Sequence, residues 1–119
     1  MNWKKLKVWQ ETHRLVLEIY KVTSSFPKSE TYGLVDQLKR SAYSVPANIV
    51  EGQSRNTTKE YIHFLYNARG SLEEVRYFLL LSYDLSFLNE NIYHELERKY
   101  ESASKMLNGL IKSIKSKLK

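Results

Sequence analysis

Apolar residues recur along the chain every three or four positions, which is the spacing that places side chains on one face of an α-helix. This spacing persists in four segments, over about residues 5–24, 31–51, 57–87 and from Asn89 or Asn91 to the terminal lysines. Because the connections between these segments are short, neighbouring helices are expected to run antiparallel. We therefore predict an all-α protein, an antiparallel up-down-up-down four-helix bundle that forms one domain over residues 1–119.

Pro46 lies within the apolar face of the second segment. A proline in a helix interior removes one hydrogen bond and clashes with the carbonyl group four residues earlier. The apolar face nevertheless continues from Leu34 to Ile49, which favours a kinked but continuous helix. A break near Ser44 is the alternative. Gly52 follows the helix as its expected C′ residue.

The third and fourth segments have recognisable starts. Thr57 and Glu60 have the spacing of a capping box, in which the glutamate side chain reaches back to the amide of the capping residue. Asn89 or Asn91 can cap the fourth helix. The expected buried face of the fourth helix consists of Ile92, Leu96, Tyr100, Ala103, Leu107, Leu110 and Ile114.

The third segment has a second apolar stripe on the side opposite its predicted core face. This stripe consists of Tyr66, Gly70, Tyr77 and Leu81. A glycine in a helix interior costs about 1 kcal/mol relative to alanine, and close approach of another helix is one use for it. We therefore predict that the stripe forms the interface of a homo-oligomer. Scattered surface aromatic residues are the alternative.

The composition excludes several classes of protein. The chain of 119 residues has no cysteine, so it has no disulfide, thiolate metal site, iron–sulfur cluster or cysteine nucleophile. Its longest apolar run, Phe78 to Leu81, is far shorter than the roughly 20 residues that span a membrane. The N-terminus lacks the apolar region of a signal peptide. These features predict a cytoplasmic protein without a membrane partner.

One sequence pattern suggests a metal site, but it is incomplete. Glu60 and His63 have the Glu-x-x-His spacing of di-iron helical bundles, which requires a second copy of the pattern. Asn91 stands where the glutamate partner of His94 would be needed. His13 lies on a third helix, and neither a Ser-His-Asp order nor a glycine-rich phosphate loop is present. We expect no metal, no other cofactor and no enzymatic activity.

The chain is basic, with 19 Lys and Arg, 13 Asp and Glu, and a formal net charge of +6. In an up-down bundle both termini lie at one end, so lysines near the two termini can form a common patch. The candidate nucleic-acid contacts are two groups: Lys39, Arg40, Arg55 and Lys59 near the second turn, and Lys112, Lys115, Lys117 and Lys119 in the C-terminal tail. The alternative is that these charges provide solubility and complement the helix dipole.

The middle of the chain contains its most distinctive motif. Residues 44–52 read SVPANIVEG, preceded by Gly33-Leu34 and Gln37-Leu38-Lys39-Arg40 and followed by Arg55. This pattern resembles the four-helix-bundle family of bacterial 23S rRNA intervening-sequence proteins. The resemblance covers nearly the whole chain. Val50 and Lys39 are small departures, since the family more often has alanine and arginine there.

The resemblance implies a function without catalysis. The family is similar to the accessory variability protein of diversity-generating retroelements, a pentameric barrel of basic bundles that binds nucleic acid and a reverse transcriptase. It therefore implies a homo-oligomer, with a pentamer as first choice, and an accessory role with RNA or DNA. A reverse transcriptase partner is implied by the resemblance alone. The alternative function is a structural or protein-interaction module with no nucleic-acid role.

The family motif also permits a physical interpretation. Pro46, Asn48, Glu51 and Gly52 form its structural part. The carboxylate of Glu51 could lie between two arginines, Arg40 and Arg55, and so hold the helix and its turn together. The alternative is that Arg40, Asn48, Glu51 and Arg55 form a cluster that faces a ligand.

Overall fold

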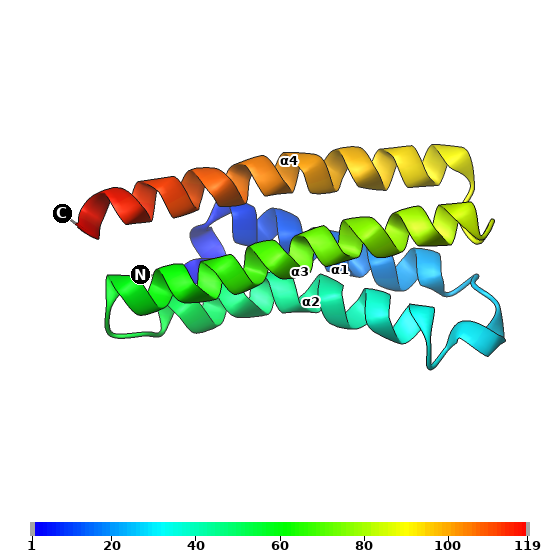
Figure 1. Ribbon diagram of the computed structural model, residues 1–119, viewed down its shortest axis with the longest axis horizontal. Helices are drawn as coiled ribbons and strands as arrows, with labels where there is room; N and C mark the ends of the chain where they lie inside the picture. Colours follow the sequence, from blue (N-terminus) through cyan, green and yellow to red (C-terminus); the bar gives the residue numbers. More distant parts are fainter. Residues whose placement is uncertain (1, 119) are drawn as a thin grey trace.

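The computed structural model describes residues 2–118 and consists of four α-helices joined by short connections (Figure 1). The helices are α1 (Lys7–Thr23), α2 (Leu34–Gln53), α3 (Thr58–Asp84) and α4 (Glu90–Lys115). Three short 3-10 helices flank them: η1 (Trp3–Lys5), η2 (Lys28–Glu30) and η3 (Ser116–Leu118). Residues 2–118 contain no β-strand. The predicted all-α four-helix bundle is therefore confirmed.

Each helix runs antiparallel to the next and packs on two neighbours, so that α1 contacts α2 and α4 while α3 contacts the same pair (Figure 1). The bundle is elongated, with principal extents of 49 × 24 × 20 Å. Helix α1 has 17 residues and α4 has 26, so the C-terminal part of α4 extends beyond the start of α1. Within residues 2–118 no helix combines the length and hydrophobicity that a membrane span requires.

The buried positions follow the predicted helical spacing closely. Leu15 and Ile19 of α1, Leu38 of α2 and Leu72 of α3 are completely buried. Helix α4 differs from the predicted buried face at two positions. Ile111 is buried while Leu110 is only half-buried, and Ile92 is exposed. The other five predicted residues of this face are buried.

Helix α2 is continuous through Pro46, so the alternative of a break near Ser44 is wrong. Three polar side chains connect the proline turn to α3. The side-chain amide of Asn48 donates to the carbonyl of Ser44 at 2.8 Å and to its hydroxyl at 3.0 Å, and the hydroxyl of Ser71 donates to that of Ser44 at 3.0 Å. These bonds satisfy polar groups beside a residue that cannot donate a backbone hydrogen bond.

Gly52 lies inside α2 and not at its C′ position, which corrects the prediction from the sequence. Its φ is not positive, so left-handed geometry does not explain the glycine. A Cβ atom at this position would lie 2.8 Å from Cδ1 of Tyr61 and 3.0 Å from Cβ of Phe64. Gly52 therefore allows the start of α3 to pack closely against the end of α2.

The turn between α2 and α3 is held by capping. The backbone N–H of Glu60 donates to the hydroxyl of Thr57 at 3.1 Å, as a capping box requires. The Glu60 carboxylate accepts from the Thr57 hydroxyl at 3.2 Å and not from the backbone amide of Thr57. On the other side of this turn, the hydroxyl of Tyr61 accepts a bond from Gln53 at 3.1 Å, and burial raises the Tyr61 pKa.

We predict that Gly52→Ala destabilises the protein by about 1–3 kcal/mol, because the added methyl group overpacks the α2–α3 contact. Urea denaturation followed by circular dichroism measures the effect. Gly109→Ala is the matched control, since no atom lies within 4 Å of the new methyl group there. That variant should gain up to about 1 kcal/mol from helix propensity. Equal stability of Gly52→Ala and wild type would contradict the close-packing explanation.

Candidate nucleic-acid interface

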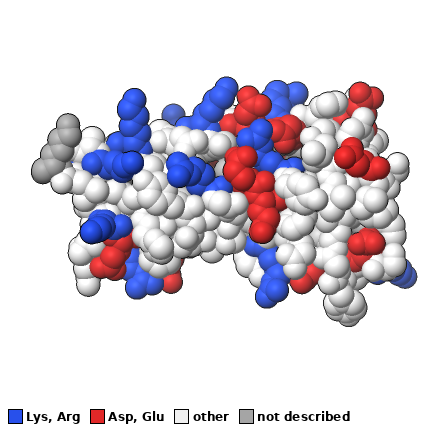
Figure 2. All heavy atoms as spheres, viewed as in Figure 1, with Lys and Arg blue, Asp and Glu red and all other residues white. Residues whose placement is uncertain are grey.

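The two halves of the bundle differ in charge. One half, which we call the basic half, comprises residues 2–14, 45–70 and 103–118, and therefore holds η1, the α2–α3 turn and the end of α4. It has eleven Lys and Arg against three Glu, whereas the other half, residues 15–44 and 71–102, has seven Lys and Arg against ten Asp and Glu. On the face shown in Figure 2, acidic side chains gather toward the α3–α4 turn, and basic side chains gather toward the opposite end.

Most cations of the basic half have no acidic partner among residues 2–118. Three of them form ion pairs, Arg14 with Glu11, Arg55 with Glu51, and Lys105 with Glu101 of the other half. The cations without a carboxylate within 4 Å are Lys4, Lys5, Lys7, Lys59, Arg69, Lys112, Lys115 and Lys117. The C-terminal lysines also follow a helix end, where positive charge is favourable. This surplus creates a field that attracts polyanions.

An aromatic ring joins α3 to the end of α4 within the basic half. The guanidinium carbon of Arg69 lies 4.8 Å from the ring centroid of Tyr66, and Nζ of Lys115 lies 5.9 Å from it. Arg69 also donates to Asn108 of α4 at 3.2 Å. Two cations therefore lie near the ring of Tyr66. The sequence pattern predicted this residue at the interface of a homo-oligomer.

The other predicted interface residues lie in different environments. Tyr77 is 57% exposed, and Gly70 has no atom within 4 Å of the position that a Cβ would occupy. Leu81 is half-buried and packs against the core, so it is not part of an open stripe. Two of the four residues, Gly70 and Tyr77, therefore remain free on the outer face of α3.

A second aromatic group lies in the basic half and was not predicted from the sequence. The rings of Trp3 and Trp9 have centroids 4.7 Å apart, and the ring of His13 stacks on Trp9 at 5.0 Å with planes 6° apart. The spacing of Trp9 and His13 by four residues places them on one face of a helix, so this pair could have been found. The position of Trp3 depends on the fold of η1.

The predicted cluster of Lys39, Arg40, Arg55 and Lys59 is not formed. Lys39 and Arg40 lie in the first half of α2, about 22 Å along the helix from Arg55 at 1.5 Å per residue. Nζ of Lys39 lies 4.6 Å from the ring centroid of Tyr20, on α1. Arg55 and Lys59 remain in the basic half with the C-terminal lysines. Lys119 lies outside the described residues.

Of the two arginines considered as partners of Glu51, only Arg55 contacts it. Arg55 pairs with Glu51 at 3.2 Å and also lies 4.6 Å above the ring of Phe64. Arg40 approaches Asp36 instead, at 4.0 Å. The side-chain amide of Asn48 is used within α2. The structure therefore does not gather the four polar residues into one ligand-facing cluster.

Residues 2–118 contain no group of three His, Asp or Glu side chains that could hold a metal ion. Glu60 accepts the hydroxyl of Thr57, and the exposed ring of His63 lies at the edge of Phe64, 5.8 Å between centroids. The Glu-x-x-His pair thus has no third ligand in the described chain.

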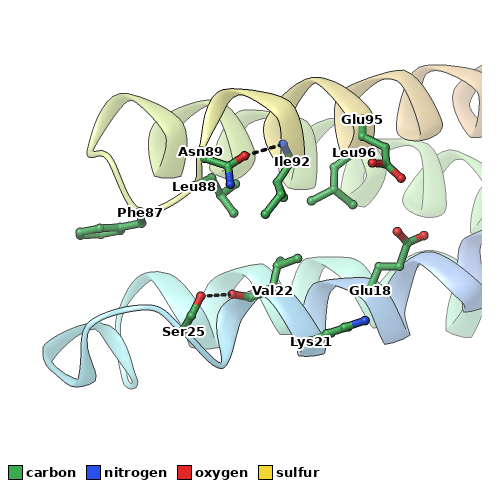
Figure 3. Close-up of a pocket in the computed structure, with 10 residues that line it drawn as sticks. All are labelled: Glu18, Lys21, Val22, Ser25, Phe87, Leu88, Asn89, Ile92, Glu95 and Leu96. Atoms are coloured by element: carbon green, nitrogen blue, oxygen red, sulfur yellow. Dashed lines mark hydrogen bonds between the residues drawn. The ribbon is translucent and has the colours of Figure 1, made fainter.

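A groove of about 460 Å³ lies between α1 and α4 in the other half of the bundle (Figure 3). Its apolar floor includes Val22 and Leu96, and the carboxylates of Glu18 and Glu95 lie on its rim. Lys99 contacts both carboxylates, at 2.9 and 3.1 Å, and these hydrogen bonds raise the Lys99 pKa. Two carboxylates at the rim disfavour phosphate, so this groove is a poor candidate for nucleic acid.

Comparison with known proteins agrees with this architecture. The family model of the 23S rRNA-intervening sequence proteins matches residues 4–109. A crystal structure of a protein of unknown function from the S23 ribosomal protein family of Bacteroides thetaiotaomicron VPI-5482 has a TM-score of 0.79, with 22% sequence identity over 88% of this chain and 98% of that one. This likeness shows the shared fold. No curated protein sequence matches the chain. Because the family model spans most of its length, the chain belongs to the family of 23S rRNA-intervening sequence proteins.

Proposed function

We propose that this protein is a non-enzymatic, oligomeric accessory protein that binds the backbone of RNA or DNA through its basic half. The observation that carries the proposal is the surplus of eleven Lys and Arg over three Glu in that half, with eight of the cations lacking an acidic partner among residues 2–118. Unpaired cations concentrated at one end destabilise a protein by mutual repulsion. A bound polyanion relieves that repulsion.

The expected contacts are phosphate contacts, which position a protein without reading sequence. Lys112 and Lys115 are exposed at the end of α4, Lys117 is exposed in η3, and Lys59 is exposed at the start of α3. Flexible lysine side chains act as point charges and suit a polyanion of variable sequence. We expect affinity of the non-specific class, with a strong dependence on salt.

Self-association would amplify this field. We propose a homo-oligomer, with five subunits as first choice from the family resemblance, and with Gly70 and Tyr77 at the contact. Glycine is less favourable than alanine in a helix interior. No other part of the chain packs so closely on Gly70 that it would exclude a side chain there. Five copies of a chain with charge +6 would carry a total of about +30.

The second candidate function is a structural or protein-interaction module, and the exposed outer face of α3 favours it. Tyr77 and Leu80 on this face are 57% and 42% exposed. The same surface could receive a protein partner in place of a second copy, and a reverse transcriptase remains a suggestion from family resemblance alone. A cytoplasmic location and the absence of a cofactor belong to the same proposal.

We predict that changing Lys112, Lys115 and Lys117 together to Gln makes oligonucleotide binding less sensitive to salt. In a plot of log affinity against log salt for duplex DNA, the slope should fall by about 0.9 for each phosphate that the variant no longer neutralises. Fluorescence anisotropy of a labelled oligonucleotide measures the slope.

The charge-matched control for this variant changes Lys21, Lys28 and Arg98 of the other half to Gln, and circular dichroism checks that both variants fold. Equal slopes for the two variants, or no binding by wild type at about 50 mM salt, would refute the proposed interface.

We predict that light scattering after size exclusion finds an oligomer of the 14.1 kDa chain, and that Tyr77→Glu shifts it toward monomer. The substitution would bury an unpartnered charge at the proposed contact. Leu17→Glu is the matched control, because Leu17 is similarly exposed, at 58%, but lies on α1. A monomeric wild type at micromolar concentration, or equal effects of the two variants, would count against this interface.

A further inference from the structure

The start of the chain is folded back so that its aromatic side chains meet. Residues 3–5 form the short helix η1, and the side chain of Asn2 accepts the backbone N–H of Lys4 at 2.9 Å. The side-chain amide of Gln10, on α1, donates to the carbonyl of Lys4 at 2.9 Å. The first bond caps η1, and the second ties η1 to the first turns of α1, where Trp3 lies against Trp9.

The three rings form one contiguous group that solvent reaches, here called the stack, in which His13 is parallel to Trp9 and Trp3 is tilted against Trp9. Trp9 packs partly against the core, while Trp3 is half-buried and His13 is exposed. Trp3 lies 4.7 Å from Trp9 at an angle of 58°, and His13 is parallel to Trp9 at 5.0 Å. Tryptophan is large and apolar, and it can bury a large area in a core. These rings are only partly buried, so part of their hydrophobic area stays exposed to solvent.

One cation lies against these rings, and others are close to them in the sequence. Nζ of Lys4 lies 5.5 Å from the ring centroid of Trp3, and Lys5 and Lys7 have no carboxylate partner among residues 2–118. Arg14 follows His13 and pairs with Glu11. The stack thus combines solvent-accessible aromatic rings with a contacting lysine, Lys4, and with neighbouring cations of the basic half.

We infer that the stack of Trp3, Trp9 and His13 is a binding site for the unpaired bases of single-stranded nucleic acid, an inference that rests on the proposed function of the basic half. Aromatic platforms combined with cations are the means by which proteins hold single strands with little sequence preference. The bases of a duplex are stacked on each other and cannot reach these rings. The site therefore makes the protein prefer single strands over duplexes of the same length.

The chain offers a direct signal for this site, because Trp3 and Trp9 are its only two tryptophans. Stacking of a base on an indole ring quenches its fluorescence. Wild-type protein is titrated at low salt with a single strand of about ten nucleotides, a length within the range of single-strand sites, with the matching duplex, and with polyglutamate. We expect quenching by the single strand alone, together with its tighter binding in an anisotropy competition.

Two substitutions and one control connect the signal to the rings. Trp3→Ala and His13→Ala should each weaken single-strand binding by about five- to 150-fold, the range for removal of one stacked base, with little change for the duplex. Tyr32→Ala is the control, because Tyr32 is 95% exposed but lies in the connection before α2, in the other half. Circular dichroism checks folding, and if Trp3→Ala alters the fold, His13→Ala supplies the same test from an exposed position.

The outcomes separate this inference from the proposed function. Binding of single strand and duplex with equal affinity and without quenching would overturn the base-stacking site while leaving backbone binding intact. Equal quenching by polyglutamate would overturn it as well, since that polymer has charge but no bases. Absence of binding by either nucleic acid would overturn both.

Discussion

The contact between α2 and α3 at Gly52 is the constraint on which the arrangement of the basic half depends. The missing side chain allows Tyr61 and Phe64 to pack within van der Waals distance of the α2 backbone. The turn that follows contains Arg55, and Lys59 lies in the first turn of α3, which Thr57 caps. The hydrogen bonds from Asn48 and Ser71 to Ser44 extend the same contact past Pro46. A looser contact would change the direction of α3, and with it the position of Tyr66 relative to Lys115 of α4.

The bundle distributes its charged side chains unevenly between its two halves. The up-down topology brings the start of α1, the α2–α3 turn and the end of α4 to one half of the molecule, and these segments hold most of the unpaired cations of residues 2–118. In contrast, the ion pairs that link different helices, Arg76 with Glu97 and Lys99 with Glu18, lie in the other half. These bonds raise the Arg76 pKa as well as that of Lys99. One half thus pairs charges between its helices, whereas the other leaves most of its cations without a carboxylate partner among residues 2–118.

The sequence predicted the helices well because burial imposes a period that local residues reveal. Leu65, Leu72 and Leu79, which follow one another at intervals of seven residues on one face of α3, are each completely buried. The sequence predicted Gly52 at the C′ position, because a glycine near a helix end usually adopts left-handed geometry there. In the structure Gly52 lies within α2, where Tyr61 and Phe64 of α3 leave no room for a side chain. The site was harder to predict. Lys39 and Arg40 adjoin the family motif in sequence, but the length of α2 separates them from Arg55. Trp3 lies against Trp9 where η1 folds back on α1, and a side-chain bond from Gln10 to the carbonyl of Lys4 ties the two helices together. The apolar periodicity of the sequence does not predict this contact.

Binding of nucleic acid to the basic half can be examined by locating the contacts along the chain. Protein would be photo-crosslinked to a thiouridine-substituted RNA, and the crosslinked peptides identified by mass spectrometry. If nucleic acid binds the basic half, crosslinks will be confined to residues 2–14, 55–69 and 105–118, from η1, the α2–α3 turn region and the end of α4. Crosslinks concentrated within residues 15–44 and 71–102, which together hold seven basic and ten acidic residues, would contradict binding at the basic half.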